Sequence, residues 1–290
     1  MIQLSKIIIA AQVLLEALPI SSSGHLFIIK ELFTKYFPES SGSLSSELFY
    51  ELLNVPTIFV IAYFFRKDIR LFTFRLLNLL KKTIRRNPSW STKHHIKFFK
   101  ILIRVAMMAV TANLITFAAY TFRKSFIRSC STPYCSQLIL LSGLFLTMTV
   151  LFSLKFKNPK SNESLDFLKA SIIGISQSFG MFPGVSRFGI TYATSRFLSI
   201  SPRRSFEFSF LLHSLLVLGL LARTAIENNK ELKLVFEHIT FSNLALIAVS
   251  AIISFFILKF SYYMAKAKQF WKFSFYFPIP IGLLVWLILS

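Results

Sequence analysis

The chain has 290 residues, of which 54% are hydrophobic and only 16% carry a charge. This composition is too apolar for an ordinary soluble domain, so we interpret the chain as an integral membrane protein. Lysine and arginine total 33 against 12 aspartate and glutamate residues, which gives a formal net charge of +21. In a membrane protein such an excess belongs to loops beside anionic headgroups, and we expect no nucleic-acid partner.

Six apolar stretches are long enough to cross a bilayer as helices, which takes about 20 residues each. In chain order they are residues 48–65, 102–122, 136–154, 206–226, 240–260 and 273–290. Two further apolar stretches, about 4–30 and 166–200, are each interrupted by a polar break. We expect each of these to form a re-entrant hairpin of two short helices. Eight or more simple spans is the alternative, because hydropathy alone does not distinguish the two patterns.

The expected fold class is therefore an all-α, polytopic membrane protein with a single membrane domain over 1–290. Its halves, about 1–135 and 136–290, share one order: a re-entrant hairpin, then about three transmembrane helices. Because each half crosses the membrane an odd number of times, the halves are expected to be inverted repeats. The similarity between them is largely a proline three residues before a serine, at Pro19–Ser22 and Pro183–Ser186.

The positive charge is concentrated in particular connections. Residues 66–100 hold eleven lysines and arginines and one acid, Asp68, and their leucines suggest an amphipathic surface helix. Further basic clusters lie at 155–160, 203–204 and 259–272. The crossing pattern places all of these on one side, which the positive-inside rule identifies as cytoplasmic. The loops then placed outside are 31–47, 123–135 and 227–238, of which 123–135 is the basic exception.

Cys130 and Cys135 are the two cysteines of the chain and lie together in a predicted external loop. Their spacing is compatible with a small disulfide, and equally with two free thiols.

The first polar break places a carboxylate in an apolar helix. Gln12 and Glu16 are four residues apart and share one helical face, and a carboxylate at membrane depth is costly enough to suggest a function. Pro19 ends this helix. The residues that follow are Ser21, Ser22, Ser23, Gly24 and His25. Serine and glycine at the start of a half-helix leave backbone N–H groups for an anion. The alternative is an interfacial Glu16 paired with lysine, with serines that merely cap the turn.

The second break repeats this chemistry with the opposite charge. Pro183 and Gly184 permit a tight turn, Ser186 adds a hydroxyl, and Thr191 lies one helical turn after Arg187. The forked guanidinium of Arg187 suits phosphate, and its place inside the break argues against an arginine that simply reaches the interface. Together the two breaks suit attack on phosphorus, with Arg187 or a divalent cation offsetting the charge of Glu16.

These residues resemble the motifs of the undecaprenyl-pyrophosphate phosphatase family of the bacitracin-resistance type. Gln12, Glu16 and the run Pro19–His25 match its first motif, (Glu/Gln)-x-x-x-Glu followed by Pro-x-Ser-Ser-(Ser/Thr)-Gly-His. The residues that match its second motif, Pro-Gly-x-Ser-Arg-Ser-Gly-x-Thr, are Pro183, Gly184, Ser186, Arg187, Gly189 and Thr191. Phe188 departs from that motif, because the family usually carries a second serine there.

The resemblance implies an undecaprenyl-diphosphate phosphatase that removes the terminal phosphate of a C55 polyprenyl pyrophosphate. The reaction is expected at the outer face of the bacterial plasma membrane. It recycles the carrier lipid for peptidoglycan synthesis, and so serves cell-wall biogenesis, cell shape and bacitracin resistance. A lipid transporter or flippase that uses the same phosphate site is the alternative function, and a homodimer is left open.

The resemblance also implies roles for the site residues. Ser22 is the expected nucleophile, with Ser21 as the alternate; Glu16 activates it or holds metal, and His25 transfers protons. Arg187 completes the catalytic set. The residues expected to bind the substrate phosphates are Ser21, Ser23, Gly24, Gly184, Ser186 and Thr191. Glu16 and Gln12 are the expected ligands of a divalent cation, Mg²⁺ or Ca²⁺.

Overall fold

A computed structural model describes residues 4–37, 52–71, 73, 74, 77, 90–129, 133–157, 163–227 and 240–289. Across these ranges the regular elements are helices, apart from one isolated bridge between Glu163 and Ile200. The expected all-α class is confirmed.

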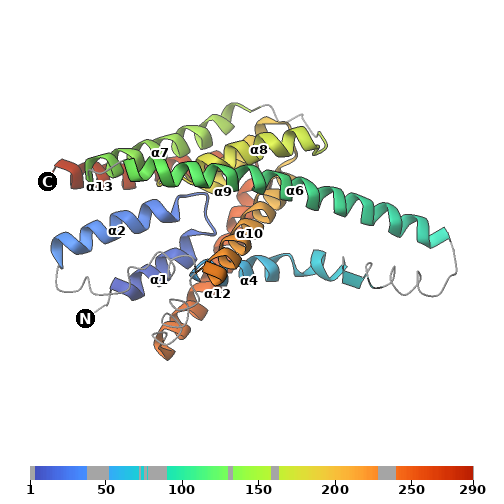
Figure 1. Cartoon of the computed structure of the whole chain (residues 1–290), viewed down its shortest axis with the longest axis horizontal. Helices are drawn as coiled ribbons and strands as arrows, with labels where there is room; N and C mark the ends of the chain where they lie inside the picture. The colour runs from blue at the N-terminus through green and yellow to red at the C-terminus, as the bar shows by residue number, and fades with distance from the viewer. Residues whose placement is uncertain are drawn as a thin grey trace.

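The elements follow one another along the chain as a series of long and short helices (Figure 1). They are α1 (Leu4–Leu15), α2 (Ser22–Tyr36), α4 (Val55–Phe64), α6 (Trp90–Ser129), α7 (Pro133–Ser153), the 3₁₀ turn η2 (Leu154–Phe156), α8 (Phe167–Phe179), α9 (Arg187–Phe197), α10 (Pro202–Glu227), α12 (Phe241–Lys266), the 3₁₀ turn η3 (Phe270–Tyr276) and α13 (Pro278–Leu289).

Five described segments are long and apolar enough to cross a membrane, and the protein is a multi-pass membrane protein. They are Lys100–Ala119, Tyr134–Phe156, Pro202–Arg223, Phe241–Lys266 and Phe270–Leu289. Each coincides with one of the predicted spans. The remaining prediction, 48–65, corresponds to the short apolar helix α4, and its first residues lie outside the described part of the chain.

Helix α6 is longer than the sequence suggested. It has 40 residues, or about 60 Å, roughly twice the thickness of the hydrocarbon core. Its start at Trp90 and its end at Ser129 take in parts of both loops predicted at 66–100 and 123–135. Those boundaries were wrong, because the loss of hydropathy that ends a span does not end a helix. Most of the predicted amphipathic segment after residue 71 lies outside the described residues.

Cys135 lies in the first turn of α7 and is disulfide-bonded. The other cysteine of the chain, Cys130, lies outside the described residues.

Two helical hairpins meet in the middle of the molecule. In Figure 1 the turn between α1 and α2 points to the centre of the molecule. Helix α8 comes from the opposite side and ends at the turn that joins it to α9. The two turns touch: a Cβ on Gly24 would lie 3.2 Å from the Cα of Gly184, and one on Gly189 would lie 3.1 Å from the Pro19 carbonyl oxygen. The hairpins therefore bring both polar breaks to one place.

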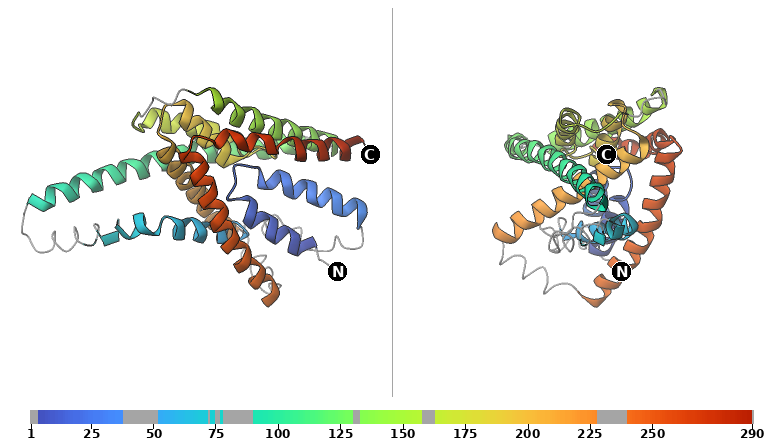
Figure 2. Two further views of the ribbon diagram at one scale, coloured as in Figure 1. Left: turned by 180° about the vertical axis from the view of Figure 1, so that it is seen from behind. Right: turned by 90° about the vertical axis from the view of Figure 1, so that its right-hand side faces the viewer.

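The long helices hold these hairpins by close contacts. Figure 2 shows from behind that α12 runs obliquely across the bundle, and it packs on α1 and α4. The Ser261 hydroxyl of α12 donates to the Ala17 carbonyl at 3.1 Å, next to the first turn. On α8, Gly174 lets the backbone approach Ala112 of α6, and Thr116 donates to the Gly174 carbonyl at 3.1 Å. Small residues and hydroxyls are common at such helix contacts in membranes.

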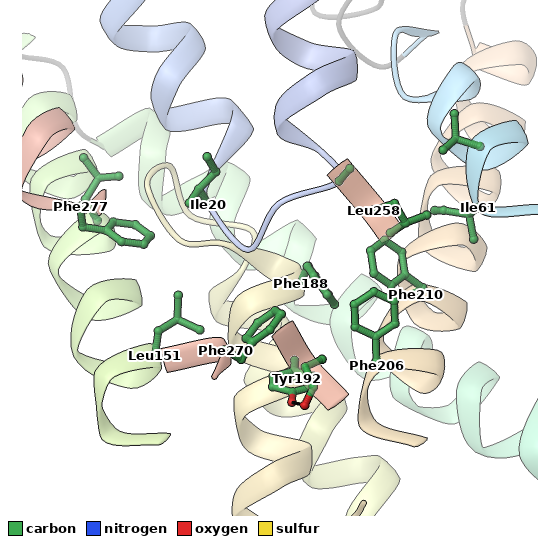
Figure 3. Packing of buried hydrophobic residues seen from close by; sticks show 14 of the residues in the cluster. Ile20, Ile61, Leu151, Phe188, Tyr192, Phe206, Phe210, Leu258, Phe270 and Phe277 are labelled. Carbon is green, nitrogen blue, oxygen red and sulfur yellow. Dashed lines mark hydrogen bonds between the residues drawn. The ribbon is translucent and has the colours of Figure 1, made fainter. Parts of the chain in front are cut away.

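An aromatic cluster lies directly behind the second turn (Figure 3). The ring of Phe188 lies 4.3 Å from that of Phe210 and 5.2 Å from that of Phe206, between centroids. Tyr192 and Phe270 stack beside it at 4.1 Å. All five side chains are buried, so this packing fixes the start of α9 relative to α10 and η3.

Candidate active site

Both central hairpins restart as helices through a serine N-cap. Ser21 precedes α2 in an extended conformation, and its Oγ accepts a hydrogen bond from the Gly24 N–H at 3.2 Å. Ser186 precedes α9 in the same way, and its Oγ accepts from the Gly189 N–H at 3.0 Å. Each half-helix thus begins with a serine that is followed three residues later by a glycine. The serine hydroxyl accepts from the glycine N–H, which would otherwise have no partner in the first turn.

Helix α7 holds the second turn in place. Gly184 has φ +84°, a left-handed conformation that favours glycine, and a Cβ there would collide with the Leu140 carbonyl. The Thr147 hydroxyl donates to the Gly184 carbonyl at 3.2 Å and accepts from the Ser186 N–H at 3.0 Å. The phosphate-binding role expected for Gly184 is therefore accompanied by a structural role in shaping the turn.

Glu16 is the centre of the polar cluster, and its side chain is almost buried. The Ser22 hydroxyl donates to Glu16 Oε2 at 2.5 Å, and the Gln12 amide donates to the same oxygen at 3.3 Å. The Arg187 guanidinium donates to Oε1 at 3.4 Å. His213 Nε2 lies 3.3 Å from Oε1 but without hydrogen-bond geometry, which leaves this nitrogen without a hydrogen-bond partner among the described residues. The Glu16 carboxylate thus contacts residues of both polar breaks.

Two helix N-termini point into a small polar cavity between the breaks. Glu16, Ser21–Ser23 and Val185–Phe188 line it, together with Leu18 and Ile20. The N–H groups of Ser22, Ser23, Arg187 and Phe188 carry no hydrogen bond within the described ranges. Such N–H groups and the two helix dipoles favour an anion. The free space is about 20 Å³, which is room for about one water molecule.

His25 lies in the first turn of α2, away from the Glu16 cluster. Its Nδ1 donates to the Ser21 carbonyl at 2.6 Å, because a carbonyl oxygen only accepts. Its Nε2 is 3.0 Å from the Tyr276 hydroxyl, and the two rings stack. The nucleophile candidate Ser22 is thus bonded to Glu16, and no contact joins it to His25 in the described structure.

The expected phosphate-binding residues divide into two groups. Ser21, Ser23 and Ser186 line the cavity, whereas Gly24, Gly184 and Thr191 do not. The Thr191 hydroxyl donates back to the carbonyls of Arg187 and Phe188, at 2.9 and 3.2 Å. Thr191 therefore supports the first turn of α9, which carries Arg187.

Several polar neighbours of the site were missed by sequence reasoning. A histidine in a predicted span either lines the cavity or packs in the core, and for His213 the sequence favoured the core; the structure places it against Glu16. Asn54 accepts from the Gln12 amide at 2.7 Å, a contact between residues 42 positions apart that no local pattern indicates. Tyr276 and Thr147 gave no signal, because their partners lie far away in the sequence.

The oxygen donors near Glu16 fit a weak divalent-cation site. Gln12 Oε1 is buried and has no hydrogen-bond partner within the described structure, while Gln12 Nε2 faces Glu16. A turn of the Gln12 amide would bring its free oxygen to the carboxylate as a second ligand. The described residues contain no cluster of three or more histidine, cysteine or acidic side chains. Such a donor set suits Mg²⁺, which commonly uses one or two protein oxygens together with water and substrate phosphates.

Comparison with known proteins shows the same pattern over nearly the whole chain. The sequence profile of the bacitracin resistance protein BacA matches residues 7–284. An undecaprenyl-diphosphatase of Treponema denticola is 28% identical over 275 residues, which cover 94% of this chain and 92% of that protein. Proteins of the same name from Staphylococcus haemolyticus (26% identical, 79% of this chain and 75% of that protein) and Wigglesworthia glossinidia (29%, 69% and 67%) also match.

The match contains both polar breaks, the hairpins that carry them and the long helices that hold them. Phe188 remains a departure from the family's usual second motif, and it belongs to the aromatic cluster. The chain belongs to the bacitracin resistance protein BacA family.

Proposed function

We propose that this protein hydrolyses undecaprenyl diphosphate to the monophosphate and inorganic phosphate, and so recycles the carrier lipid for cell-wall synthesis. The name shared by its relatives supports the substrate. The observation that carries the chemistry is the 2.5 Å hydrogen bond from the Ser22 hydroxyl to Glu16, beside Arg187. A nucleophile held on a base, with a cation close by, is what phosphoryl transfer requires.

Ser22 attacks the terminal phosphorus, and Glu16 Oε2 receives its proton. A bond forms between Ser22 Oγ and phosphorus, and the bond from phosphorus to the bridging oxygen breaks, which releases polyprenyl phosphate. Glu16 passes its proton to solvent, and water then attacks the phosphoserine. Glu16 accepts a proton from that water and returns it to Ser22 Oγ as the phosphorus–Oγ bond breaks, and inorganic phosphate leaves. Ser21 is the less suitable nucleophile, because its Oγ is occupied by the Gly24 N–H as the cap of α2.

Arg187 and the free N–H groups bind the terminal phosphate. The charge that grows on its oxygens is stabilised by the guanidinium and by Ser22, Ser23 and Phe188 N–H groups at the two helix N-termini. The cavity is too small for a phosphate while Arg187 pairs with Glu16. Substrate entry therefore separates this pair, and Arg187 exchanges a carboxylate for a phosphate.

His25 supplies the proton for the leaving oxygen. It is three residues after Ser22, and Tyr276 and the Ser21 carbonyl hold its ring in one orientation. In the described structure the ring faces Tyr276 and does not line the catalytic cavity, so this role requires His25 to turn toward the leaving oxygen when substrate binds. Glu16 and Gln12 would hold a divalent cation, which when bound supplies positive charge to the phosphates.

A lipid transporter that uses the same cavity is the second candidate. The observation that favours it is the meeting of two broken-helix hairpins at their turns, an arrangement typical of transporters. The bond between Ser22 and Glu16 favours hydrolysis, since transport needs a complementary charge and no activated hydroxyl.

The deciding experiment measures phosphate release from undecaprenyl diphosphate by the purified protein in detergent, with and without Mg²⁺ or Ca²⁺. We expect Ser22→Ala and Arg187→Ala to lower kcat/KM by about 10²-fold or more, the scale seen when one catalytic group is lost. Ser178→Ala is the matched control, because that hydroxyl bonds only to Gly174 in the described structure. Ser21→Ala distinguishes the two serines.

Binding of the substrate without phosphate release, under any cation tested, would favour the transporter instead. Full activity of Ser22→Ala together with loss in Ser21→Ala would move the nucleophile to Ser21.

A further inference from the structure

A second cavity lies between α6 and α10, apart from the catalytic one. It encloses about 440 Å³, within the range typical of small-molecule sites. Ile101, Arg104, Val105 and Met108 line it from α6, a spacing of three and four residues that forms one helical face. Arg204, Glu207, Phe208 and Leu211 line it from α10 with the same spacing. Ser164, Leu165 and Ile200 close the end beside the bridge of Glu163 and Ile200.

The two helix faces show the same order of residues, with an arginine first and apolar side chains deeper in the span. Arg104 lies near the start of the apolar span Lys100–Ala119, and Arg204 near the start of the span Pro202–Arg223. Beyond each arginine, one turn further into its span, the lining becomes apolar, with Met108 on α6 and Phe208 on α10. The cavity thus has a cationic mouth and an apolar interior.

The acids near this mouth are already paired with other cations. Arg203 Nε lies 2.6 Å from a Glu207 oxygen, and Arg203 also reaches Asp68 at 3.9 Å. Asp166 accepts the Lys169 N–H at 2.8 Å and lies 3.4 Å from its ammonium group. Arg104 is close enough to Asp166 for an electrostatic attraction. Neither Arg104 nor Arg204 forms an ion pair within the part of the chain that the structure describes.

We propose that this cavity binds an anionic phospholipid, with its phosphodiester between Arg104 and Arg204 and an acyl chain along Met108, Phe208 and Leu211. Basic pockets between transmembrane helices are typical sites for anionic headgroups. A zwitterionic lipid fits less well, because its ammonium group would lie against the same two arginines. A soluble anion would leave the apolar interior unfilled.

The site would tie α6 to α10 and to the start of α8. Helix α8 leads to the second catalytic turn and packs closely on α6 at Gly174. A lipid that fills the cavity replaces open space between these helices with contacts, so its binding is expected to raise the thermal stability of the whole protein.

Native mass spectrometry of the detergent-solubilised protein, titrated with phosphatidylglycerol or phosphatidylcholine of the same chains, tests the proposal. Two arginines at about 1 kcal/mol each predict a preference for phosphatidylglycerol of about 30-fold. Arg104→Gln with Arg204→Gln is expected to abolish this preference. The matched control, Lys67→Gln with Arg70→Gln, removes two charges from the neighbouring segment around Asp68, outside the cavity, and is expected to keep it.

A second variant separates the cavity from the charge. Leu211→Trp keeps both arginines and fills the interior of the cavity. It is expected to lower phosphatidylglycerol binding at least tenfold. This variant also tests the proposal if the double arginine variant does not fold. Equal binding of the two lipids by the native protein would overturn the proposal. So would a preference that survives in Arg104→Gln/Arg204→Gln, or full binding in Leu211→Trp.

Discussion

Phe188 shows how one residue can change its role within a motif. The family usually has a serine here, so the sequence suggested a phosphate pocket that lacks one hydroxyl. The side chain is 5% exposed and packs on Phe206, Phe210 and Phe270. In this protein the position contributes mainly to the packing that holds α9.

Restoring the serine is therefore expected to harm the protein. Phe188→Ser removes a buried ring from an aromatic cluster, which costs about 3–5 kcal/mol for comparable truncations, and it buries a hydroxyl. We expect a lower Tm in thermal denaturation and no gain in kcat/KM. Phe188→Leu, which keeps an apolar side chain, is the control with the smaller loss. An unchanged Tm with faster turnover in Phe188→Ser would show that the missing hydroxyl matters more than the packing.

Glu16 illustrates the limit of reasoning from residue types. The spacing of Gln12 and Glu16 on one face predicted their contact, which the structure confirms at 3.3 Å. The motifs left open whether Arg187 or a cation offsets Glu16, and whether Glu16 activates Ser22 or holds metal; the structure places Ser22, Arg187 and also His213 against this one carboxylate. Those approaches depend on the packing of α9 and α10, which no local pattern encodes.

At the level of elements, the turn before α9 depends on one glycine. Gly184→Ala places a Cβ against the Leu140 carbonyl and requires a positive φ that alanine rarely adopts. We expect a lower Tm and a loss of phosphatase activity of at least tenfold, because the turn carries Ser186 and Arg187. Gly219→Ala in α10 is the matched control, since a Cβ there meets nothing within 4 Å and alanine favours helix. Equal behaviour of the two variants would contradict a special role for this turn.

The start of α8 provides a test by pH. The Lys169 N–H donates to the Asp166 carboxylate, which holds the pKa of Asp166 below its usual value. A lowered pKa means that the stabilisation is present above the unfolded pKa, about 3.9, and is lost as the pH falls through the folded value. We expect Asp166→Ala to lower Tm at neutral pH, with the difference from the native protein shrinking below about pH 4.

Asp166→Asn is the companion variant, because it keeps an acceptor at the cap but does not titrate. Its Tm should exceed that of Asp166→Ala at every pH. A difference between native protein and Asp166→Ala that stays constant into acid would show that the carboxylate charge is irrelevant.

The whole molecule has one end that is rich in arginine and lysine. Lys155 and Lys157 follow α7, and Arg203 and Arg204 begin α10, where Arg203 reaches Asp68 after α4. We propose that this end is cytoplasmic, as the positive-inside rule requires, and that substrate reaches the catalytic cavity from outside.

Thiol labelling in cells tests this orientation. In a chain without Cys130 and Cys135, Lys157→Cys should resist a membrane-impermeant maleimide until the cells are permeabilised. Lys35→Cys, at the other end of the molecule near the end of α2, should react in intact cells. The reverse labelling pattern would show that the protein has the opposite orientation in the membrane.

The division into two inverted repeats near residue 135 stays a prediction. Helices α1 and α2 lie on either side of the first polar break, and α8 and α9 on either side of the second. That these pairs are re-entrant in the membrane also stays a prediction. The length of α6 was not foreseeable from hydropathy, because a helix that leaves the bilayer keeps its backbone hydrogen bonds in water.

The sequence by itself determined that this is a membrane protein, where five of its spans lie, and which two short polar segments interrupt its apolar helices. These follow from local properties: apolar length, the proline and glycine that break helices, and the cost of a charge at membrane depth. Only the tertiary structure decided that Ser22 bonds to Glu16, that His213 joins that cluster, and that Phe188 serves packing. Each of these contacts joins segments through the packing of helices, whose relative rotation no local pattern in the sequence specifies.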